Sequence, residues 1–157
     1  MIVKHPMRRQ DRALSEAEAR EILARAEYGV LASVGEDGWP YAVPVNHVLS
    51  GDSLYIHCAV EGHKLQNLAH NERVSYCVVG CAEVLQGQLS TRYESAIAFG
   101  RVSLLQDPAE KRTALEELVR RLAPVRTHDA GPIIENQLEH TVILRLRLER
   151  LTGKARR

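Results

Sequence analysis

The chain of 157 residues has the length of one domain, enough to bury a core without disulfides or bound metal. Its 21 lysines and arginines nearly balance 20 aspartates and glutamates, and aromatic residues make up only 4% of the chain, so we expect no nucleic-acid partner. No apolar run is long enough for a membrane span, which predicts no membrane partner, and the odd number of cysteines, three, suits a reducing cytoplasm.

The N-terminal region predicts an arm followed by a helix. Residues 1–13 show no apolar periodicity, and we interpret them as an arm or strap. Ser15 and Glu18 then match a capping box, in which the two side chains satisfy free backbone N–H groups at a helix start. Apolar residues at helical spacing extend this first predicted helix to about Glu27.

Three β-rich segments follow, joined by short turns that contain glycine, and they predict an antiparallel meander. We place the strands at residues 28–34, 39–49 and 54–59. Pro40 and Pro44 each lack a backbone N–H, so the second strand should be bent, bulged or at a sheet edge over part of its length.

The second half predicts two long strands, a long helix and a final strand. Strands at residues 73–80 and 93–105 flank an excursion at residues 81–92 that has no clear period, and long excursions are often functional. Gly100 interrupts the second of these strands, where we expect a bulge or the close approach of another backbone segment. Asp107 and Pro108 open a helix that ends at Pro124, residues 125–137 form a loop, residues 141–151 alternate as a strand, and residues 152–157 form a tail.

This pattern gives about six strands and three helices, and hairpin connections dominate. Too few helices separate the strands for a parallel sheet, so the predicted fold class is α+β with an antiparallel barrel or sandwich. We interpret residues 1–157 as a single domain, with an arm at 1–13 and a tail at 152–157.

Residues 54–71 carry the strongest functional signal, because a strand there leads through a glycine turn to a short helix. At helical spacing His63, Lys64 and Asn67 share one face of this helix, and apolar residues share the opposite face. Free N–H groups at a helix start, with a lysine beside them, suit a phosphate group. The alternative is that these polar residues are solvated and bind nothing.

Histidines and cysteines elsewhere do not indicate a metal site. His57 and Cys58 are neighbours on a strand, so their side chains point to opposite faces, and no second pair of ligands accompanies them. Cys77 and Cys81 lie four residues apart on a strand, roughly 13 Å, which is too far for a redox pair. We therefore predict no metal.

The order of several short motifs resembles a known family. The motifs are Arg8-Arg9-x-Asp11-Arg12, Tyr28-Gly29-Val30-Leu31, Gly38-Trp39-Pro40-Tyr41 with Pro44-Val45-Asn46, Leu54-Tyr55-Ile56-His57-Cys58-Ala59 with Glu61-Gly62-His63-Lys64 and Asn67-Leu68, and Tyr93-Glu94-Ser95 with Phe99-Gly100. Together they resemble the pyridoxamine 5'-phosphate oxidase-like flavin proteins, and within these the nitroimidazole-resistance branch most closely. The likeness extends from about residue 8 to residue 122.

The resemblance implies a split β-barrel with flanking helices that forms a homodimer and holds one FMN in each of two clefts between subunits. Lys64 and its turn match the family's phosphate contacts, and the segment 43–46 lies along the isoalloxazine ring in such proteins. Either subunit can supply the residues that complete the cleft. The cofactor-binding residues predicted from the motifs and the helix face are Trp39, Val43, Pro44, Val45, Asn46, His57, Cys58, His63, Lys64, Asn67, Tyr93 and Ser95.

The resemblance further implies an FMN-dependent oxidoreductase that acts on a small-molecule substrate such as a nitroaromatic compound. His63 matches a histidine that the nitroimidazole-resistance branch places near the flavin as a catalytic residue, and histidine is suited to donate a proton to a reduced substrate. Two alternatives stay open: a flavin-binding carrier or sensor without turnover, and a haem-handling split barrel. The chain lacks the arginine and histidine set that the vitamin-making oxidases use near their C-terminus, so the resemblance leaves the substrate open.

Overall fold

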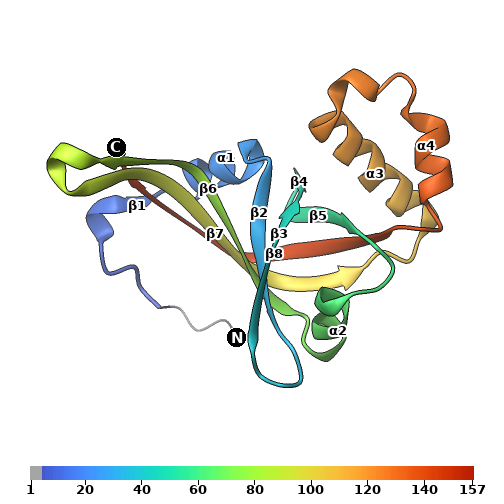
Figure 1. Cartoon of the computed structure of the whole chain (residues 1–157), viewed down its shortest axis with the longest axis horizontal. Coiled ribbons are helices and arrows are strands. Elements are labelled where there is room, and N and C mark those ends of the chain that lie inside the picture. Colours follow the sequence, from blue (N-terminus) through green and yellow to red (C-terminus); the bar gives the residue numbers. More distant parts are fainter. Residues whose placement is uncertain (1–4) are drawn as a thin grey trace.

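Within residues 5–157, the part that the computed structural model describes, one antiparallel sheet of eight strands carries helices at its flanks (Figure 1). The strands are β1 (Ala13–Leu14), β2 (Tyr28–Val34), β3 (Pro40–Asn46), β4 (Val48–Ser50), β5 (Ser53–Cys58), β6 (Arg73–Leu85), β7 (Ser90–Leu104) and β8 (Val142–Arg156). The helices are α1 (Glu16–Arg25), α2 (His63–His70), α3 (Pro108–Leu122) and α4 (Ala130–Gln137), with short 3-10 helices η1 (Gln10–Arg12), η2 (Gln86–Gln88) and η3 (Pro124–Arg126).

The sheet curls into a half-barrel. Its strand order is β3-β2-β6-β7-β8-β5-β4, and β1 pairs with β8. Although β3 and β5 are far apart in this order, they lie beside each other in space, so the sheet closes partly on itself. The closure is incomplete, because β3 and β4 end the strand order and each keeps one edge without a strand partner in the described sheet. The predicted α+β class and antiparallel split barrel are confirmed.

The main hydrophobic core fills the inside of the curl. Its fully buried side chains include Leu31, Leu54, Ile56, Tyr76, Leu144 and Leu146. Helix α1 contacts β6, β7 and β8 and adds Ala19, Ile22 and Leu23 to this core. Each large apolar side chain that is fully buried contributes about 1.5–3 kcal/mol to folding.

A second, smaller core lies between the helices α3 and α4 and the strands β5 and β8. Its members are Val48, Leu105, Ala114, Leu115, Leu118, Ala130, Ile134 and Ile143. This cluster anchors one face of β5, the strand that ends at His57 and Cys58. None of the helices in the described part is long and apolar enough to cross a membrane.

The predicted caps of α1 and α3 are confirmed. Ser15 Oγ accepts a hydrogen bond from the N–H of Glu18 at 3.2 Å, and the Glu18 carboxylate accepts one from the N–H of Ser15 at 2.9 Å. Asp107 caps α3 by accepting from the N–H of Glu110 at 3.1 Å, and Pro108 is the first residue of that helix. Such caps contribute about 1 kcal/mol each.

The predicted strand at residues 39–49 is two strands, and the first of them, β3, lies at a sheet edge as the prolines predicted. β3 ends at Asn46 and β4 begins at Val48, and His47 between them is buried. The His47 ring reaches the backbone of α1, where its Nε2 lies 2.7 Å from the carbonyl oxygen of Leu23, and this inward contact interrupts the strand. As a result β3 pairs with β2, whereas β4 pairs with β5. The predicted three-stranded meander is therefore wrong, because the two hairpins lie at opposite ends of the strand order.

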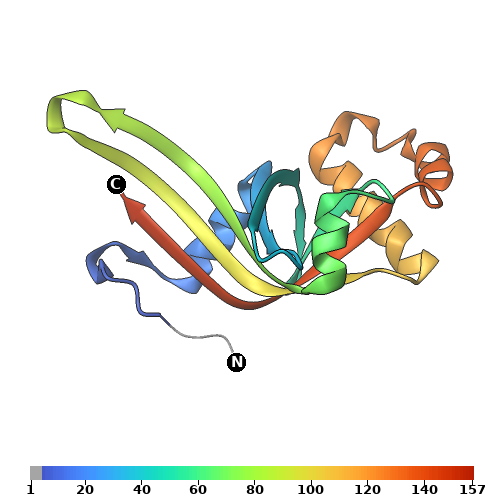
Figure 2. The same ribbon diagram turned by 60° about the horizontal axis from the view of Figure 1, so that its bottom comes forward.

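Residues 81–92 form regular structure, which corrects the predicted excursion. β6 and β7 remain paired from Cys81 and Glu94 out to Leu85 and Ser90, and η2 closes the hairpin. We call residues 80–94 the β-arm, and Figure 2 shows that it projects away from the barrel. Most of its side chains are exposed on both faces, so the sequence there carries no core-facing period.

Two further segments are more regular than predicted. The expected loop at 125–137 contains η3 and α4, because Gly131 and Pro132 lie in the first turn of α4, where a helix tolerates a missing N–H. The expected tail at 152–157 is strand up to Arg156, because β7 offers a partner along the whole of this segment. At the other end, β1 pairs Ala13, the last residue of the predicted arm, and Leu14 with β8. Residues 1–4 of that arm lie outside the described residues.

The prediction for Gly100 is confirmed. The pairing of β7 with β8 shifts register between Phe99 and Gly100, which is a β-bulge. A β-carbon on Gly100 would overlap the carbonyl oxygen of Arg147, so only glycine fits at this position without a backbone shift.

Candidate functional site

Three elements meet where the sequence has its strongest functional signal. β5 ends at Cys58, and a short turn leads to α2, which begins at His63. β3 lies beside β5, and Tyr41 of β3 contacts the ring of His63. We call this region the α2 corner and define it by Tyr41, His57, Cys58, His63 and Lys64.

The turn before α2 depends on Gly62. Its backbone has φ 137° and ψ 166°, a conformation that residues with a side chain rarely adopt. Within the described residues no side chain caps α2, so the N–H groups of its first turn have no side-chain acceptor. Free N–H groups and the positive end of the helix dipole together favour an anion at this position.

Lys64 places a positive charge at the same helix start. Its side chain is half-buried and forms no ion pair or hydrogen bond with any residue between 5 and 157. Burial lowers the pKa of His57, and Lys64 lowers it further, whereas burial raises the pKa of the Cys58 thiol against the opposing effect of Lys64. The lysine therefore acts on the end of β5, and it can pair with an anion at little cost because it gives up no existing partner.

His63 is held against β3. Its ring centroid lies 4.1 Å from that of Tyr41, at an interplanar angle of 43°. Tyr41 is half-buried, whereas His63 is exposed. The imidazole therefore has a supported orientation and can still exchange protons with solvent or a bound molecule.

β3 offers the corner a strand edge and one exposed face. Val43 and Val45 pack against the main core, whereas Pro44 and Asn46 are exposed on the other face. Asn46 Nδ2 donates to the carbonyl oxygen of Glu27 at 2.9 Å. Because β3 pairs with β2 alone, its second edge is free of a strand partner within the described sheet.

The predicted exposure of Asn67 beside His63 and Lys64 is wrong. Asn67 is 4% exposed, and its Nδ2 donates to Ser33 Oγ at 3.2 Å. A β-carbon on Gly35 would overlap the Asn67 amide oxygen, so the amide fills space that the glycine leaves beside the β2–β3 hairpin. Asn67 therefore joins α2 to β2, and we assign it a structural contact.

Two of the predicted cleft residues lie apart from the α2 corner within one chain. Tyr93 and Ser95 are half-buried on β7 at the base of the β-arm, which both ribbon views place far from α2 (Figures 1 and 2). In a single chain these two residues therefore do not share a site with Lys64. Trp39 is 75% exposed beside the tight turn between β2 and β3, two residues before Tyr41.

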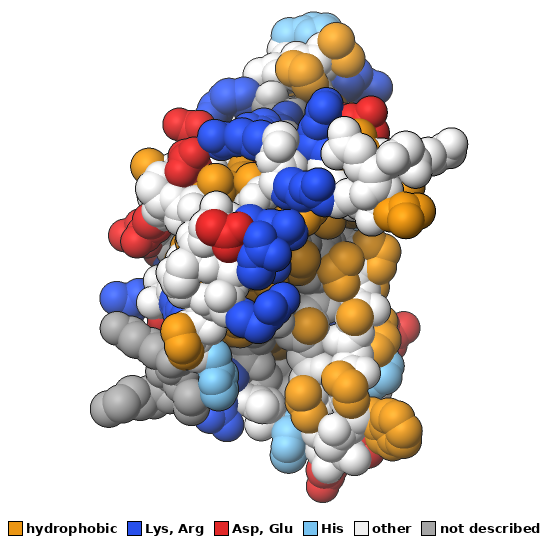
Figure 3. All heavy atoms as spheres, turned by 90° about the vertical axis from the view of Figure 1, so that its left-hand side faces the viewer, with side chains coloured by type: hydrophobic (Ala, Val, Ile, Leu, Met, Phe, Trp, Pro, Cys, Tyr) orange, Lys and Arg blue, Asp and Glu red, His pale blue; other side chains and the backbone are white. Residues whose placement is uncertain are grey.

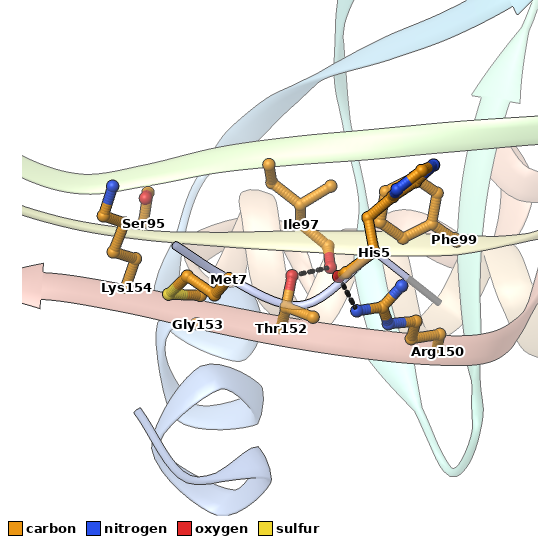
Figure 4. A pocket seen from close by; sticks show the side chains of 9 residues that line it. All are labelled: His5, Met7, Ser95, Ile97, Phe99, Arg150, Thr152, Gly153 and Lys154. Atoms are coloured by element: carbon orange, nitrogen blue, oxygen red, sulfur yellow. Dashed lines mark hydrogen bonds between the residues drawn. The ribbon is translucent and has the colours of Figure 1, made fainter. Parts of the chain in front are cut away.

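Ser95 instead borders a hollow of about 330 Å³ on the outer face of β7 and β8 (Figure 4). The hollow lies under the N-terminal segment, where Arg150 donates to the carbonyl oxygen of His5 at 2.9 Å. Apolar and cationic side chains share its lining: Met7, Ile97, Phe99, Arg150 and Lys154.

The outer face of the half-barrel carries a continuous apolar strip. Direct cross-strand pairs join Pro44 to Val30, Val30 to Cys77, and Cys77 to Ile97, so these side chains share one face. Val30 and Ile97 are 36% and 37% exposed, and Val79 on the same face is 59% exposed. Figure 3 shows a face where hydrophobic side chains gather beside a band of lysines and arginines. We call Val30, Pro44, Cys77, Val79 and Ile97 the outer strip.

The described residues contain no group of three or more histidine, cysteine, aspartate or glutamate side chains that could hold a metal ion. His57 is exposed and Cys58 is buried, which agrees with their predicted opposite orientations. The three cysteines are unpaired.

A family model described as pyridoxamine 5'-phosphate oxidase matches residues 15–155, nearly the whole chain. The chain belongs to this family. The match includes the whole α2 corner and the outer strip, and it extends beyond the C-terminal limit of the resemblance in the sequence. A comparison with curated proteins found no match for this pyridoxamine 5'-phosphate oxidase family member.

Several solved structures share the fold of this family member. A candidate 5-nitroimidazole antibiotic resistance protein from Bacteroides thetaiotaomicron is 25% identical, with a TM-score of 0.77 over 90% of this chain and 85% of that one. An FAD and haem binding protein from Mycobacterium smegmatis is 26% identical, with a TM-score of 0.77 over 90% of this chain and 71% of that one. An FAD-binding protein from Mesorhizobium loti is 25% identical, with a TM-score of 0.69 over 93% of this chain and 98% of that one.

Sequence reasoning on this family member missed Tyr41 as a site residue. Tyr41 ends the motif Gly38-Trp39-Pro40-Tyr41 and alternates with Trp39 and Val43 along the predicted strand, but the motif assigned no site role to it. Its contact with His63 depends on how β3 lies against α2, which local sequence does not encode.

Proposed function

We propose that the protein is a flavoprotein that binds FMN at the α2 corner and acts as an oxidoreductase on a small acceptor such as a nitroaromatic compound. The observation that carries this proposal is Lys64, a half-buried cation without a counter-charge among the described residues, at the uncapped start of α2. The similar proteins described as FAD-binding support a flavin. The unpaired cysteines suit the reducing cytoplasm that we propose as its location.

The residues of the corner fit the parts of FMN. The phosphate dianion needs donors and a cation, which the first turn of α2 and Lys64 supply. The flat ring needs an apolar surface with a polar edge. Pro44, which lies outside the α2 corner on the exposed face of β3, and the free edge of that strand would supply them between the subunits. One lysine at one helix start matches a single phosphate monoester, which favours FMN over the larger FAD. Titration with both flavins, followed by the quenching of flavin fluorescence, tests this preference.

A bound flavin would supply electron transfer, and the chain would supply position and protons. His63 holds a proton at an exposed imidazole whose ring is oriented by Tyr41. That proton can pass to an oxygen or nitrogen atom of the acceptor as negative charge develops there. In the proposed reaction His63 is the general acid.

Replacing His63 with alanine should therefore slow turnover without releasing FMN. General acid catalysis contributes about 100-fold or more, so we expect a loss of that order. The measurement is the anaerobic rate at which a nitroaromatic compound reoxidises the photoreduced flavin of the protein. His70→Ala is the matched control, because His70 is exposed at the other end of the same helix.

The outcomes of this experiment separate the alternatives. An unchanged rate in His63→Ala removes the proposed role of the histidine. A wild-type protein that binds FMN and does not pass electrons to the acceptor is instead a flavin carrier or sensor.

Haem is the second candidate ligand. The M. smegmatis protein at 26% identity is described as binding both FAD and haem, and His57 and His63 are exposed imidazoles in the α2 corner. Haem would give an intense Soret band on reconstitution, and its binding would not require a phosphate site. The free cation at Lys64 therefore favours flavin.

We also propose that the protein is a homodimer in which the outer strip faces a second copy and the cofactor lies between subunits. The strip joins four strands into one exposed apolar surface, the kind of surface that is buried in protein interfaces. In a dimer, Tyr93 and Ser95 from the partner would be free to complete the α2 corner, which one chain leaves without them.

Val30→Asp should convert the dimer to a monomer and reduce FMN retention. Val30 lies at the centre of the outer strip, where it pairs directly with Pro44 and Cys77, so the substitution would bury an unpaired charge. Sedimentation velocity at micromolar concentration measures the oligomeric state. Val125→Asp is the control, because Val125 is 78% exposed on η3, away from the strip. A wild-type monomer that retains its full flavin content would contradict the dimer.

A further inference from the structure

His47 is a buried histidine that belongs to a hydrogen-bond chain of three short polar contacts. It is 1% exposed, and it is the single residue that separates strand β3 from strand β4. Its Nε2 lies 2.7 Å from the carbonyl oxygen of Leu23, and its Nδ1 lies 2.9 Å from the hydroxyl of Tyr76. The same hydroxyl lies 2.8 Å from the carbonyl oxygen of Val45. A buried chain thus runs from the end of α1 through two side chains to the backbone of β3.

The number of protons available to this hydrogen-bond chain depends on whether the His47 imidazole is neutral or protonated. Each of the three contacts needs one proton, and the two carbonyl oxygens at its ends supply none. A neutral imidazole and the Tyr76 hydroxyl supply two protons, so one contact joins two acceptors and cannot be a hydrogen bond. An imidazolium supplies two protons and Tyr76 a third, so all three contacts become hydrogen bonds, and Tyr76 must then donate to Val45.

Groups from four elements act on His47. Burial lowers the pKa of His47, the carbonyl of Leu23 in the last turn of α1 raises it, and the positive charge of Arg121 on α3 lowers it. Tyr76 on β6 keeps its proton, because burial raises the pKa of its phenol. On β3 the group in the chain is the Val45 carbonyl. The neutral form therefore prevails at neutral pH, and acid drives the chain towards its fully bonded form.

We propose that His47 is a positioning residue for β3: through Tyr76 it holds the Val45 carbonyl, and uptake of one proton completes the chain and fixes the segment 43–46. The proposal rests on the proposed function where it concerns FMN, because this segment borders the proposed flavin site. His47 itself touches neither flavin nor substrate.

Proton uptake by His47 also affects stability, and the sign follows from its pKa. The folded protein holds the proton less tightly than the unfolded chain, so the contribution of His47 to stability is fully present above the ordinary histidine range. That contribution is lost as the pH falls from the ordinary histidine pKa towards the lower value in the folded protein. The segment 43–46 thus becomes more rigid in acid as overall stability falls.

The test is an NMR titration of the full-length protein as purified. We expect the Val45 carbonyl carbon and the Asn46 amide nitrogen to shift with the same midpoint as the His47 ring. In Tyr76→Phe, His47 should still titrate, with a midpoint at lower pH, and the Val45 and Asn46 signals should no longer follow it. Tyr55→Phe is the matched control, because Tyr55 is a half-buried tyrosine on β5 that packs against the second core.

Signals from Val45 and Asn46 that ignore His47, or that follow it equally in Tyr76→Phe, would overturn the proposal. This measurement needs no flavin, so it stands even if FMN does not bind. If FMN binds, Tyr76→Phe should raise the dissociation constant of FMN by about threefold or more, which is the effect expected from the loss of one hydrogen bond. It should also change the ratio of the dissociation constants measured at acidic and at neutral pH. Weaker binding with an unchanged ratio would show a structural role alone and would also overturn the proposal.

Discussion

Lys64→Glu is expected to weaken FMN binding at least tenfold, which corresponds to about 1.4 kcal/mol. The substitution replaces the unpaired cation at the start of α2 with an anion that repels the phosphate group. The effect should shrink at high salt, because Lys64 is only half-buried and its charge is partly screened. Fluorescence titration of the variant at low and high salt measures both quantities.

The Lys64→Glu variant should also change the pKa of His57, and this effect can be measured without flavin. Burial is the main cause of the lowered pKa of His57, and the charge of Lys64 is the second cause. Removal of the lysine should therefore raise the pKa of His57. An NMR titration of His57 shows whether residue 64 still acts on the end of β5. Arg126→Glu is the control, because it makes the same change of charge at an exposed position on η3. An FMN affinity that falls less than tenfold in Lys64→Glu would remove this lysine from the phosphate site.

Gly100→Ala is expected to destabilise the fold by about 3 kcal/mol or more. The added β-carbon would overlap the carbonyl oxygen of Arg147, which is part of the β8 backbone and cannot rotate away. The bulge between Phe99 and Gly100 would have to shift, and with it the pairing of the two longest strands of the sheet. Urea denaturation followed by circular dichroism measures the change in free energy of unfolding.

Gly87→Ala is the matched control for this prediction. Gly87 lies in η2 at the tip of the β-arm, and a β-carbon there would meet no heavy atom within 4 Å. We expect its stability to stay within about 0.5 kcal/mol of wild type. Equal stability of the two alanine variants would show that β8 can move away from residue 100 freely.

Local sequence rules predicted the parts of the fold that depend on neighbouring residues. The capping box of Ser15 and Glu18 acts within one helical turn, and the cap at Asp107 does the same. The bulge at Gly100 followed from a glycine in a strand. These features need no knowledge of the rest of the chain.

The prediction failed where distant contacts decide the structure. The β-arm is exposed on both faces, so its strands lack the alternation that marks a half-buried strand. A helical projection placed Asn67 with His63 and Lys64, but the space beside Gly35 on the neighbouring hairpin draws the amide inwards. The break at His47 likewise depends on Leu23 and Tyr76, which lie far away in the sequence.

For the candidate site, too, the residues of one local motif lie together as predicted, whereas the residues of a separate motif lie elsewhere in the chain. Lys64, His63 and Gly62 were predicted from one short motif, and they do lie together at the start of α2. Tyr93 and Ser95 came from a separate motif, and within one chain they lie at the base of the β-arm. Sequence motifs do not say which copy of the chain supplies a residue, so the sequence alone did not place Tyr93 and Ser95 relative to Lys64 in the proposed dimer.

The visible absorption spectrum of the freshly purified protein, before and after addition of FMN and removal of the excess, tests the central claim most directly. We predict the paired bands of an oxidised flavin, retained after removal of free FMN in about one equivalent per chain if each of two clefts holds one cofactor. A colourless protein that takes up no FMN, or one that shows a Soret band in place of the flavin bands, would contradict the flavoprotein account.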